Sequence, residues 1–503
     1  MMITMTGWRF EHTYADLPQL FWTPAAPTAV REPRMAAFNR PLATMLGLDP
    51  GTLEGPAGAA IFAGNTLPEG ARPIAQAYAG HQFGHFTGLG DGRAILLGEQ
   101  ITPSGDRLDI QLKGAGQTRF SRRGDGRAAL GPMLREYIIS EAMHALGIPT
   151  TRSLAVVTTG ETVYRERALQ GAVLTRVAAS HIRVGTMQWA AAHDDPNATR
   201  ALADYTLARH YPELTVPACA TTPADKPECY IALFDAIVAR QASLIARWQL
   251  VGFIHGVMNT DNMALSGETI DYGPCAFMDT YDPATVFSSI DHGGRYAYGN
   301  QPPIAQWNLA RLAEAMLLLF DVDTERAVAR ATEALDRFPG RFHQHWLDGM
   351  RAKLGLFTPE DDDEALINSL LAWMRQRSAD FTNTFRSLTR RCGCAASAGQ
   401  GRDAALPEAD AEWEAWRCRW EARRARQPQL PAEAEGLMRQ HNPAVIPRNH
   451  HVEAALVAAT DGDLSVMERL LEVLATPYDH DRDLPTFTAP GSSEQPYRTF
   501  CGT

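Results

Sequence analysis

The sequence predicts an α+β fold with two lobes, a β-rich N-lobe followed by a helical C-lobe. A length of 503 residues favours several domains or one large two-lobed unit. Glycines and β-like segments are concentrated in the first part of the chain, and helical periodicity dominates the middle. The predicted units are an N-lobe (1–185), a helical C-lobe (186–390), a helical C-terminal extension (391–476) and an extended tail containing Cys501 (477–503).

The N-lobe is expected to hold a small antiparallel sheet with one packed helix. The helix is predicted over 130–146, where Leu134 and Ile138 lie on one face and Gly147 ends the periodic pattern. Strands are predicted over 93–101, 107–115, 153–160 and 171–178, with a Gly/Arg-rich loop at 114–127. In the C-lobe and the extension, helices are predicted over 230–250, 309–320 and 412–426.

Composition excludes several classes of protein. The formal net charge is −11, which argues against nucleic-acid binding by counterion release and favours a soluble monomer. No uninterrupted apolar run reaches the ~18 residues of a membrane span. The N-terminus lacks the pattern of a signal or transit peptide. We therefore expect a cytoplasmic protein that does not bind membranes.

Closely spaced glycines come directly before the first predicted strand. Gly88, Gly90 and Gly92 would let backbone amides approach phosphate groups without a clash from Cβ. Lys113 ends the second strand, and Glu136 lies in the helix that follows. A kinase uses such a glutamate to hold its strand lysine. Each feature alone is weak, because glycine turns and solvated charged side chains are common.

The next pattern is more specific. His255 and Asn262 have the spacing of the kinase catalytic loop H-x-D-x-x-x-x-N, and Asp271-Tyr-Gly stands after a predicted hairpin where kinases have D-F-G. The oxygens of Asn262 and Asp271 are of the kind that Mg²⁺ prefers. Because all these features occur in kinase order, the sequence predicts a protein-kinase-like fold and an ATP-dependent transferase.

The catalytic loop departs from the kinase pattern at one position. Val257 replaces the aspartate of H-x-D, and a valine cannot accept a proton. Asp261 is the only nearby carboxylate in this loop. The residues therefore leave two interpretations open, a nucleotide binder without catalysis or a different transfer with a relocated base.

Long segments of the chain resemble one known family. Four segments carry the resemblance, at 78–99, 109–154, 252–274 and 442–456. They include the strings DIQLKGAGQTRF and GFIHGVMNTDNM. Through most of its length the chain resembles the selenoprotein O (SelO/YdiU) family of protein adenylyltransferases. The resemblance implies a two-lobed kinase-like fold and transfer of AMP from ATP to Ser, Thr or Tyr hydroxyls of proteins, with release of pyrophosphate.

The same resemblance assigns roles to individual residues. It implies that Asp261 accepts the proton, that Asn262 and Asp271 hold Mg²⁺ or Mn²⁺, and that Glu136 positions Lys113. ATP would bind in the orientation opposite to that in kinases. The sequence leaves open whether UTP also serves as donor. The implied nucleotide contacts are Gly90, Gly92, Arg93, Lys113, Asp125, Gly126, Arg176, Arg183 and Asp271, with Arg176 and Arg183 as phosphate clamps.

Cys275 follows the Asp271-Tyr-Gly-Pro segment, and Cys501 lies where the family often carries cysteine or selenocysteine. From this resemblance we expect a regulatory disulfide between them, with two free thiols as the alternative.

Three functions compete. They are AMP transfer to protein hydroxyls, transfer of the γ-phosphate as in an ordinary protein kinase with Asp261 as base, and a catalytically silent, ATP-binding pseudokinase. Val257 counts against the second, whereas the presence of Asp261, Asn262 and Asp271 counts against the third. AMP transfer is the leading expectation, with proteins as acceptors.

Overall fold

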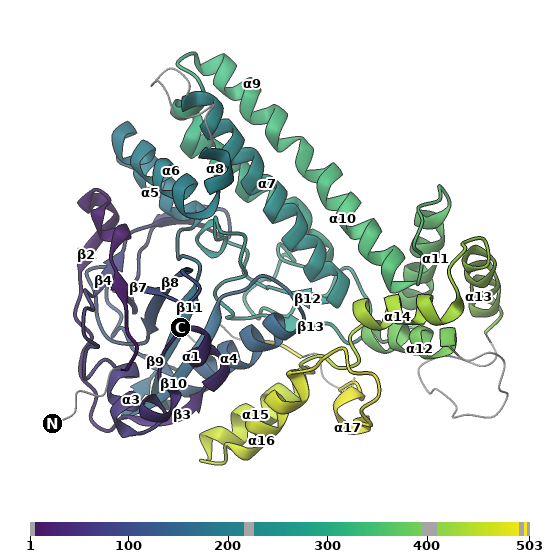
Figure 1. Cartoon of the computed structure of the whole chain (residues 1–503), viewed down its shortest axis with the longest axis horizontal. Coiled ribbons are helices and arrows are strands. Elements are labelled where there is room, and N and C mark those ends of the chain that lie inside the picture. Colours follow the sequence, from purple (N-terminus) through teal and green to yellow (C-terminus); the bar gives the residue numbers. More distant parts are fainter. Residues whose placement is uncertain (1–5, 216–225, 394–409, 492–496, 500–503) are drawn as a thin grey trace.

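The computed structural model describes residues 6–215, 226–393, 410–491 and 497–499. Strands predominate before residue 179 and helices after it (Figure 1). The expected mixture of α and β structure with an antiparallel sheet is therefore confirmed.

The antiparallel sheet is larger than the sequence predicted, because short strands from the first 76 residues join it. It has nine strands in the order β2-β4-β7-β8-β11-β10-β3, with β1 paired to β7 and β9 to β11. Their bounds are β1 (Phe10–Glu11), β2 (Trp22–Pro24), β3 (Arg34–Phe38), β4 (Ile74–Gln76), β7 (Ala94–Ile101), β8 (Arg107–Lys113), β9 (Ala128–Ala129), β10 (Arg152–Tyr164) and β11 (Ala168–Ala178). A separate hairpin is formed by β5 (Ala79–Gln82) and β6 (His85–Gly88).

Both faces of the sheet are covered, because side chains alternate along each strand. In β7, Ile95 and Leu97 belong to one apolar cluster and Leu96 to another. The first cluster packs under α1 (Arg40–Met45), α2 (Pro50–Leu53) and α3 (Pro56–Phe62). The second packs against α4 (Leu130–Ala145), whose Leu134 and Ile138 are buried as the periodicity predicted.

The helical part is built around α7 (Lys226–Val251). This helix packs against α8 (Gln301–Phe320), α9 (Thr324–Leu335) and α10 (Arg337–Lys353). Two shorter helices, α5 (Val184–Ala192) and α6 (Pro196–His210), connect this bundle to the sheet. The small ladder of β12 (Phe253–Ile254) and β13 (Ala276–Phe277) follows α7 in the chain and precedes α8.

One helical stretch, Pro227–Val251, is long and apolar enough by length and composition to cross a membrane. Sequence inspection found no such run, because charged residues interrupt it. In the structure 61% of its most apolar 18-residue stretch is buried, and Leu233, Phe234 and Ile237 lie in the core. Central helices of globular domains pass the same test, and α7 has the packing of such a helix.

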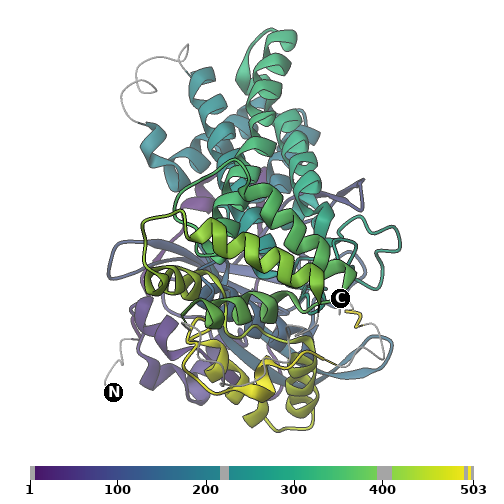
Figure 2. The same cartoon turned by 90° about the vertical axis from the view of Figure 1, so that its right-hand side faces the viewer.

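The described residues of the C-terminal extension are mainly helical. Helices α11 (Asp363–Gln376) and α12 (Phe381–Gly393) lead into it. The helices α13 (Ala411–Arg424), α14 (Pro431–His441), α15 (Asn449–Thr460) and α16 (Ser465–Leu474) lie within it, and α17 (Pro485–Thr488) lies in the tail. Figure 2 shows the green C-terminal helices in front and the yellow α15–α17 region below them. Both α15 and α16 pack against α4, so the extension returns to the sheet-rich part.

Two local predictions differ from the structure. Residues 263–270 form a turn, but its flanks do not pair as a hairpin: Ala264 bridges to Arg183, and Thr269 to Thr150. The tail, expected to be extended, contains the short helix α17, and near its end Thr499 bridges to Ser288. Both differences arise because these segments find partners far away in the sequence.

Candidate active site

The register of the sheet places a lysine and an arginine on one face. In the pairing of β8 with β11, Gln111 lies opposite Arg176, and Lys113 is two residues further along β8. Alternation therefore directs Lys113 and Arg176 to the same side. Helix α4 crosses this side and contributes Glu136, whose carboxylate accepts hydrogen bonds from Lys113 Nζ at 2.6 Å and Arg176 Nη2 at 2.7 Å.

The loop after β12 carries the catalytic-loop motif. His255 Nε2 lies 2.9 Å from the carbonyl oxygen of Ile270, which fixes the loop against the segment before Asp271. Asn262 Nδ2 donates to the carbonyl oxygen of Val257 at 2.9 Å, so the amide group of Asn262 has a defined orientation. Side-chain hydrogen bonds to backbone oxygens therefore hold the loop at both ends.

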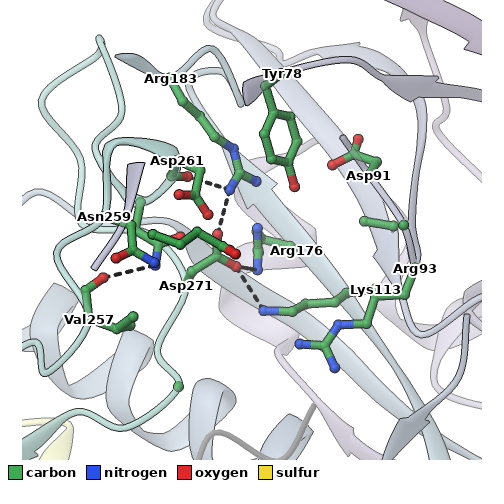
Figure 3. A pocket seen from close by; sticks show the side chains of 15 residues that line it. Tyr78, Asp91, Arg93, Lys113, Arg176, Arg183, Val257, Asn259, Asp261 and Asp271 are labelled. Atoms are coloured by element: carbon green, nitrogen blue, oxygen red, sulfur yellow. Dashed lines mark hydrogen bonds and ion pairs between the residues drawn. The ribbon is translucent and has the colours of Figure 1, made fainter. Parts of the chain in front are cut away.

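Asp271 is the meeting point of three cations (Figure 3). Its Oδ1 accepts from Lys113 Nζ at 2.9 Å and from Arg176 Nη2 at 2.5 Å, and its Oδ2 from Arg183 Nη1 at 2.6 Å. Asp271 has φ of 63°, a left-handed conformation that few residues other than glycine adopt. The ionic contacts hold the residue in this conformation.

Arg183 connects the two parts of the molecule. It is the residue before α5, and its Nη1 also donates to the backbone oxygen of Asp261 at 2.7 Å. Its guanidinium lies 4.6 Å from the centre of the Tyr78 ring, within the range of a cation–π interaction. One side chain therefore contacts the β4–β5 connection, the catalytic loop and Asp271.

These side chains surround a cavity of about 310 Å³. On the sheet side it is lined by Arg93, Lys113 and Arg176 together with the Asp91 carboxylate. On the side of the catalytic loop it is lined by carboxylate and amide groups, with Arg183 beside Asp261 (Figure 3). Its walls are formed by Tyr78, Gln82, Asp91, Gly92, Arg93, Ala94, Lys113, Arg176, Arg183, Val257, Asn259, Asp261, Asn262, Asp271 and Gly273.

Burial and charge act in opposite directions on the acids around the cavity. Burial alone would raise the pKa of Glu136 and Asp271, but Arg176 and Lys113 outweigh it and hold both pKa values below the usual range. For Asp261 and Asp91 burial prevails over the charge of Arg183 and raises each pKa to about 6. All four carboxyls are therefore mainly ionised at neutral pH.

Some of the residues proposed from the sequence lie outside the cavity lining. Gly90 faces Phe120, whose ring atoms would be 2.4 Å from a Cβ at that position. Asp125 is partly exposed and pairs with Arg165 at 2.9 Å, and its neighbour Gly126 bonds to the backbone within the same loop. The structure therefore brings together Gly92, Arg93, Lys113, Arg176, Arg183, Asp261, Asn262 and Asp271, with Glu136 behind them.

Sequence reasoning missed Tyr78, Gln82, Asp91 and Asn259 in the lining. Asp91 could have been found, since it stands between the glycines of the G-x-G-x-G pattern. Its Oδ2 accepts from the backbone of Gln76 and from Gln111, both at 3.1 Å. Gln82 belongs to the β5–β6 hairpin and Tyr78 directly precedes it, and no local sequence pattern indicates that this hairpin approaches the catalytic loop.

The expected disulfide falls partly outside the described residues, which do not include Cys501. Cys275 is buried, and the hydroxyl of Thr499 donates to the carbonyl oxygen of Pro274 at 2.7 Å. The tail therefore reaches the backbone next to Cys275, and the pairing of the two cysteines stays a prediction.

Comparison with known proteins identifies the family. Residues 4–475 match the family described as "Protein adenylyltransferase SelO". The chain belongs to the SelO family. This confirms the family and the nucleotidyltransferase class expected from the sequence, and the name of the family implies ATP as the donor.

Proteins named "Protein nucleotidyltransferase YdiU" are similar along their whole length. Those of Geobacillus kaustophilus (strain HTA426) and Halalkalibacterium halodurans are each 58% identical over 499 residues, which is 99% of this chain and 99% and 98% of theirs. The protein of Shouchella clausii (strain KSM-K16) is 56% identical over 504 residues and 100% of both chains.

Proposed function

We propose that this SelO-family protein has a kinase-like fold and transfers AMP from ATP to Ser, Thr or Tyr hydroxyls of proteins, releasing pyrophosphate. The N-lobe (1–185) and the C-lobe (186–390) would form the site, with the extension (391–476) and the tail (477–503) packed around them. One observation carries the proposal: the cavity has cations on its sheet side and the Asp261 carboxylate on the other, while Val257 occupies the position of the kinase base.

The cations suit the leaving group of this reaction. Lys113, Arg176 and Arg183 gather around one carboxylate, Asp271, within 2.9 Å. Planar guanidinium groups bind phosphate oxygens through paired hydrogen bonds, and fixed positive charge stabilises the charge that develops on pyrophosphate. Gly92 and Arg93 line the same cavity and are further proposed nucleotide contacts. Gly90, Asp125 and Gly126 lie outside its lining, and their contacts with the nucleotide stay a prediction from the family resemblance.

Asp261 is the proposed base. With a pKa of about 6, its carboxylate is mainly ionised at neutral pH and close enough to that pH to accept a proton efficiently. The acceptor hydroxyl transfers its proton to Asp261 as its oxygen attacks the α-phosphorus. The bond from the α-phosphorus to the bridging oxygen breaks, and pyrophosphate leaves towards Lys113 and the two arginines.

The residue types suit a hard divalent cation, and both oxygens of Asp271 here accept hydrogen bonds from Lys113, Arg176 and Arg183. Asn262 and Asp271 line the same cavity as Asp261 and would hold Mg²⁺ or Mn²⁺. Mg²⁺ is commonly held by one or two protein carboxylates plus phosphate oxygens and water. Among the described residues there is no cluster of three or more acids, histidines or cysteines that could hold a metal ion. When bound, the ion neutralises phosphate charge.

The test follows the labelled phosphorus. The full-length protein is incubated with Mg²⁺ or Mn²⁺ and with ATP labelled at the α or the γ position, and dephosphorylated casein supplies hydroxyls. AMP transfer predicts protein-bound label from α-labelled ATP only, together with release of pyrophosphate. Label from the γ position only would identify a kinase. Bound ATP with no label from either position would identify a pseudokinase.

Labelled UTP in the same assay shows whether the uridine nucleotide also serves as donor. We propose that the acceptors are proteins and that neither nucleic acid nor a membrane takes part. We also propose that the enzyme is a cytoplasmic monomer.

A further inference from the structure

The β5–β6 hairpin lies directly on the catalytic loop. The amide of His81 donates to Thr260 Oγ1 at 2.7 Å, and the amide of Phe83 donates to Asn259 Oδ1 at 3.1 Å. Thr260 and Asn259 are the two residues before Asp261. A segment about 180 positions earlier in the sequence therefore covers the side of the loop that carries the proposed base.

The contact between the hairpin and Asp261 is very close. A Cβ at Gly80 would lie 2.2 Å from Asp261 Oδ1, so only glycine allows the strand to approach this carboxylate. Asp261 is 7% exposed, and its Oδ1 is buried without a hydrogen-bond partner among the described residues. The hairpin thus occupies the space through which water would otherwise reach Asp261 from this side.

The tip of the hairpin has an unfavourable residue for its backbone conformation. Gln82 pairs with His85, which leaves a two-residue turn of Phe83 and Gly84, with φ of 50° and 88°. Such turns strongly prefer Asn-Gly, because a bulky side chain with positive φ is strained. Phenylalanine is therefore not explained by the turn itself.

The contacts of Phe83 supply a reason for its presence. Its ring packs against Tyr296 with the ring centroids 5.2 Å apart, and the Tyr296 hydroxyl donates to Asn259 Oδ1 at 2.6 Å. The same Asn259 oxygen accepts from the Phe83 amide. Each of these three residues therefore contacts the other two: Phe83, Tyr296 and Asn259. Their contacts join the hairpin tip to the catalytic loop and to the segment after Asp271.

We propose that the β5–β6 hairpin is a lid that keeps water away from Asp261, and that Phe83 is the positioning residue that holds this lid closed. The inference rests on the proposed AMP transfer. Water and an acceptor hydroxyl compete for the same α-phosphorus: attack by the hydroxyl gives AMP–protein and pyrophosphate, whereas attack by water gives free AMP and pyrophosphate. In both cases Asp261 takes the proton. A closed lid favours transfer by excluding bulk water.

The test is the substitution Phe83→Asn in the full-length protein. Asn-Gly is a favoured two-residue turn, so the hairpin itself stays intact while the contact with Tyr296 is lost. With α-labelled ATP and casein, we expect protein-bound AMP to form roughly 10- to 100-fold more slowly, as for a displaced catalytic group. We also expect a larger share of the label to appear as free AMP, with a smaller change in the KM for ATP.

The matched control is Phe86→Asn on the same hairpin. The Phe86 side chain is 49% exposed, and its ring contacts the His81 ring within the hairpin, with centroids 5.2 Å apart, whereas the Phe83 ring contacts Tyr296 outside it. We therefore expect wild-type transfer and wild-type partition of the label. If Phe83→Asn also leaves both quantities unchanged, the proposal is wrong. If Phe86→Asn alters the partition as strongly as Phe83→Asn, the effect is not specific to the Phe83 contacts, and the proposal is again overturned.

Hydrogen exchange separates this proposal from the proposed function. The His81 amide is bonded to Thr260, so Phe83→Asn should accelerate its exchange while leaving amides in the core of α7 unchanged. If the wild-type protein transfers no AMP but this exchange accelerates, the reaction was assigned incorrectly and the hairpin contact correctly. Unchanged exchange at His81 refutes the role of Phe83 whatever the reaction is.

Discussion

Asp271 shows how this cavity holds several charges out of water. Lys113 comes from β8, Arg176 from β11 and Arg183 from the start of α5, and all three contact the one carboxylate. Glu136 forms ion pairs with Lys113 and Arg176 and so neutralises part of the remaining positive charge. Leaving a buried charge without its partner is strongly destabilising, so these residues are coupled and cannot be removed one at a time without cost.

At the scale of single residues, we predict different results for substitution of Asp261, the proposed base, and of Asp271, a proposed metal ligand. Asp261→Asn keeps the shape of the side chain but removes the base, so AMP transfer should fall roughly 10²–10⁴-fold. ATP affinity, measured by calorimetry, should change little. Asp271→Asn should lower both transfer and metal-dependent ATP affinity, because it removes a proposed ligand and the carboxylate that Lys113, Arg176 and Arg183 share. Transfer at the wild-type rate by Asp261→Asn would contradict the assignment of the base.

At the scale of elements, the C-terminal extension fastens the segment that follows Asp271. Arg448, at the start of α15, contacts Asp279 at 2.5 Å and Asp380 at 2.6 Å. Asn449 donates to the carbonyl oxygen of Phe277 in β13 at 2.8 Å. One helix start therefore joins β13, the residues after it and α12, which explains how an extension remote in sequence supports the region of the active site.

We predict that Arg448→Met lowers the free energy of unfolding by about 3–5 kcal/mol, because it leaves Asp279 and Asp380 without their buried partner. The matched control is Arg469→Met, which removes an exposed arginine from a pair with Glu472 on α16 and should cost less than about 1 kcal/mol. Urea unfolding followed by circular dichroism measures both. Equal effects of the two substitutions would show that the Arg448 contacts add no stability.

At the scale of the whole molecule, Lys353 joins three helices in the interior. It ends α10, and its Nζ lies 4.2 Å from the centre of the Phe385 ring in α12 and 3.5 Å from the carbonyl oxygen of His441 at the end of α14. The side chain is almost fully buried, and burial lowers the pKa of its ammonium group to about 7 from 10.5. The folded chain therefore gives up this proton more easily than the unfolded chain.

This difference predicts how stability depends on pH. Between the folded pKa of about 7 and the unfolded value of 10.5, the unfolded chain holds more protons, so the free energy of unfolding rises with pH. Below that window the contribution is unfavourable and constant. Within this pH window, the free energy of unfolding of the wild type should rise by up to about 1.4 kcal/mol per pH unit relative to that of Lys353→Met. Parallel pH profiles of the two proteins, from urea unfolding, would contradict the prediction.

The sequence by itself determined the parts of this protein that depend on neighbouring residues. Periodicity located α4, and spacing located the loop from His255 to Asn262 and Asp271, because local backbone geometry fixes how residues a few positions apart are placed. The sequence also placed Lys113 in a strand and Glu136 in the helix that follows, and in the structure Lys113 Nζ lies 2.6 Å from a carboxylate oxygen of Glu136. Long specific strings were sufficient to indicate the family.

Only the tertiary structure decided which distant segments meet. Strands β1 to β4 are too short to show a clear alternation, and they form because an existing sheet supplies their hydrogen bonds. Tyr78 and Gln82 line the cavity because a hairpin packs on a loop far along the chain, and Asp125 lies outside because Arg165 holds it at the surface. Such contacts are set by the packing of whole elements and by the burial of charge, neither of which leaves a pattern within a short stretch of sequence.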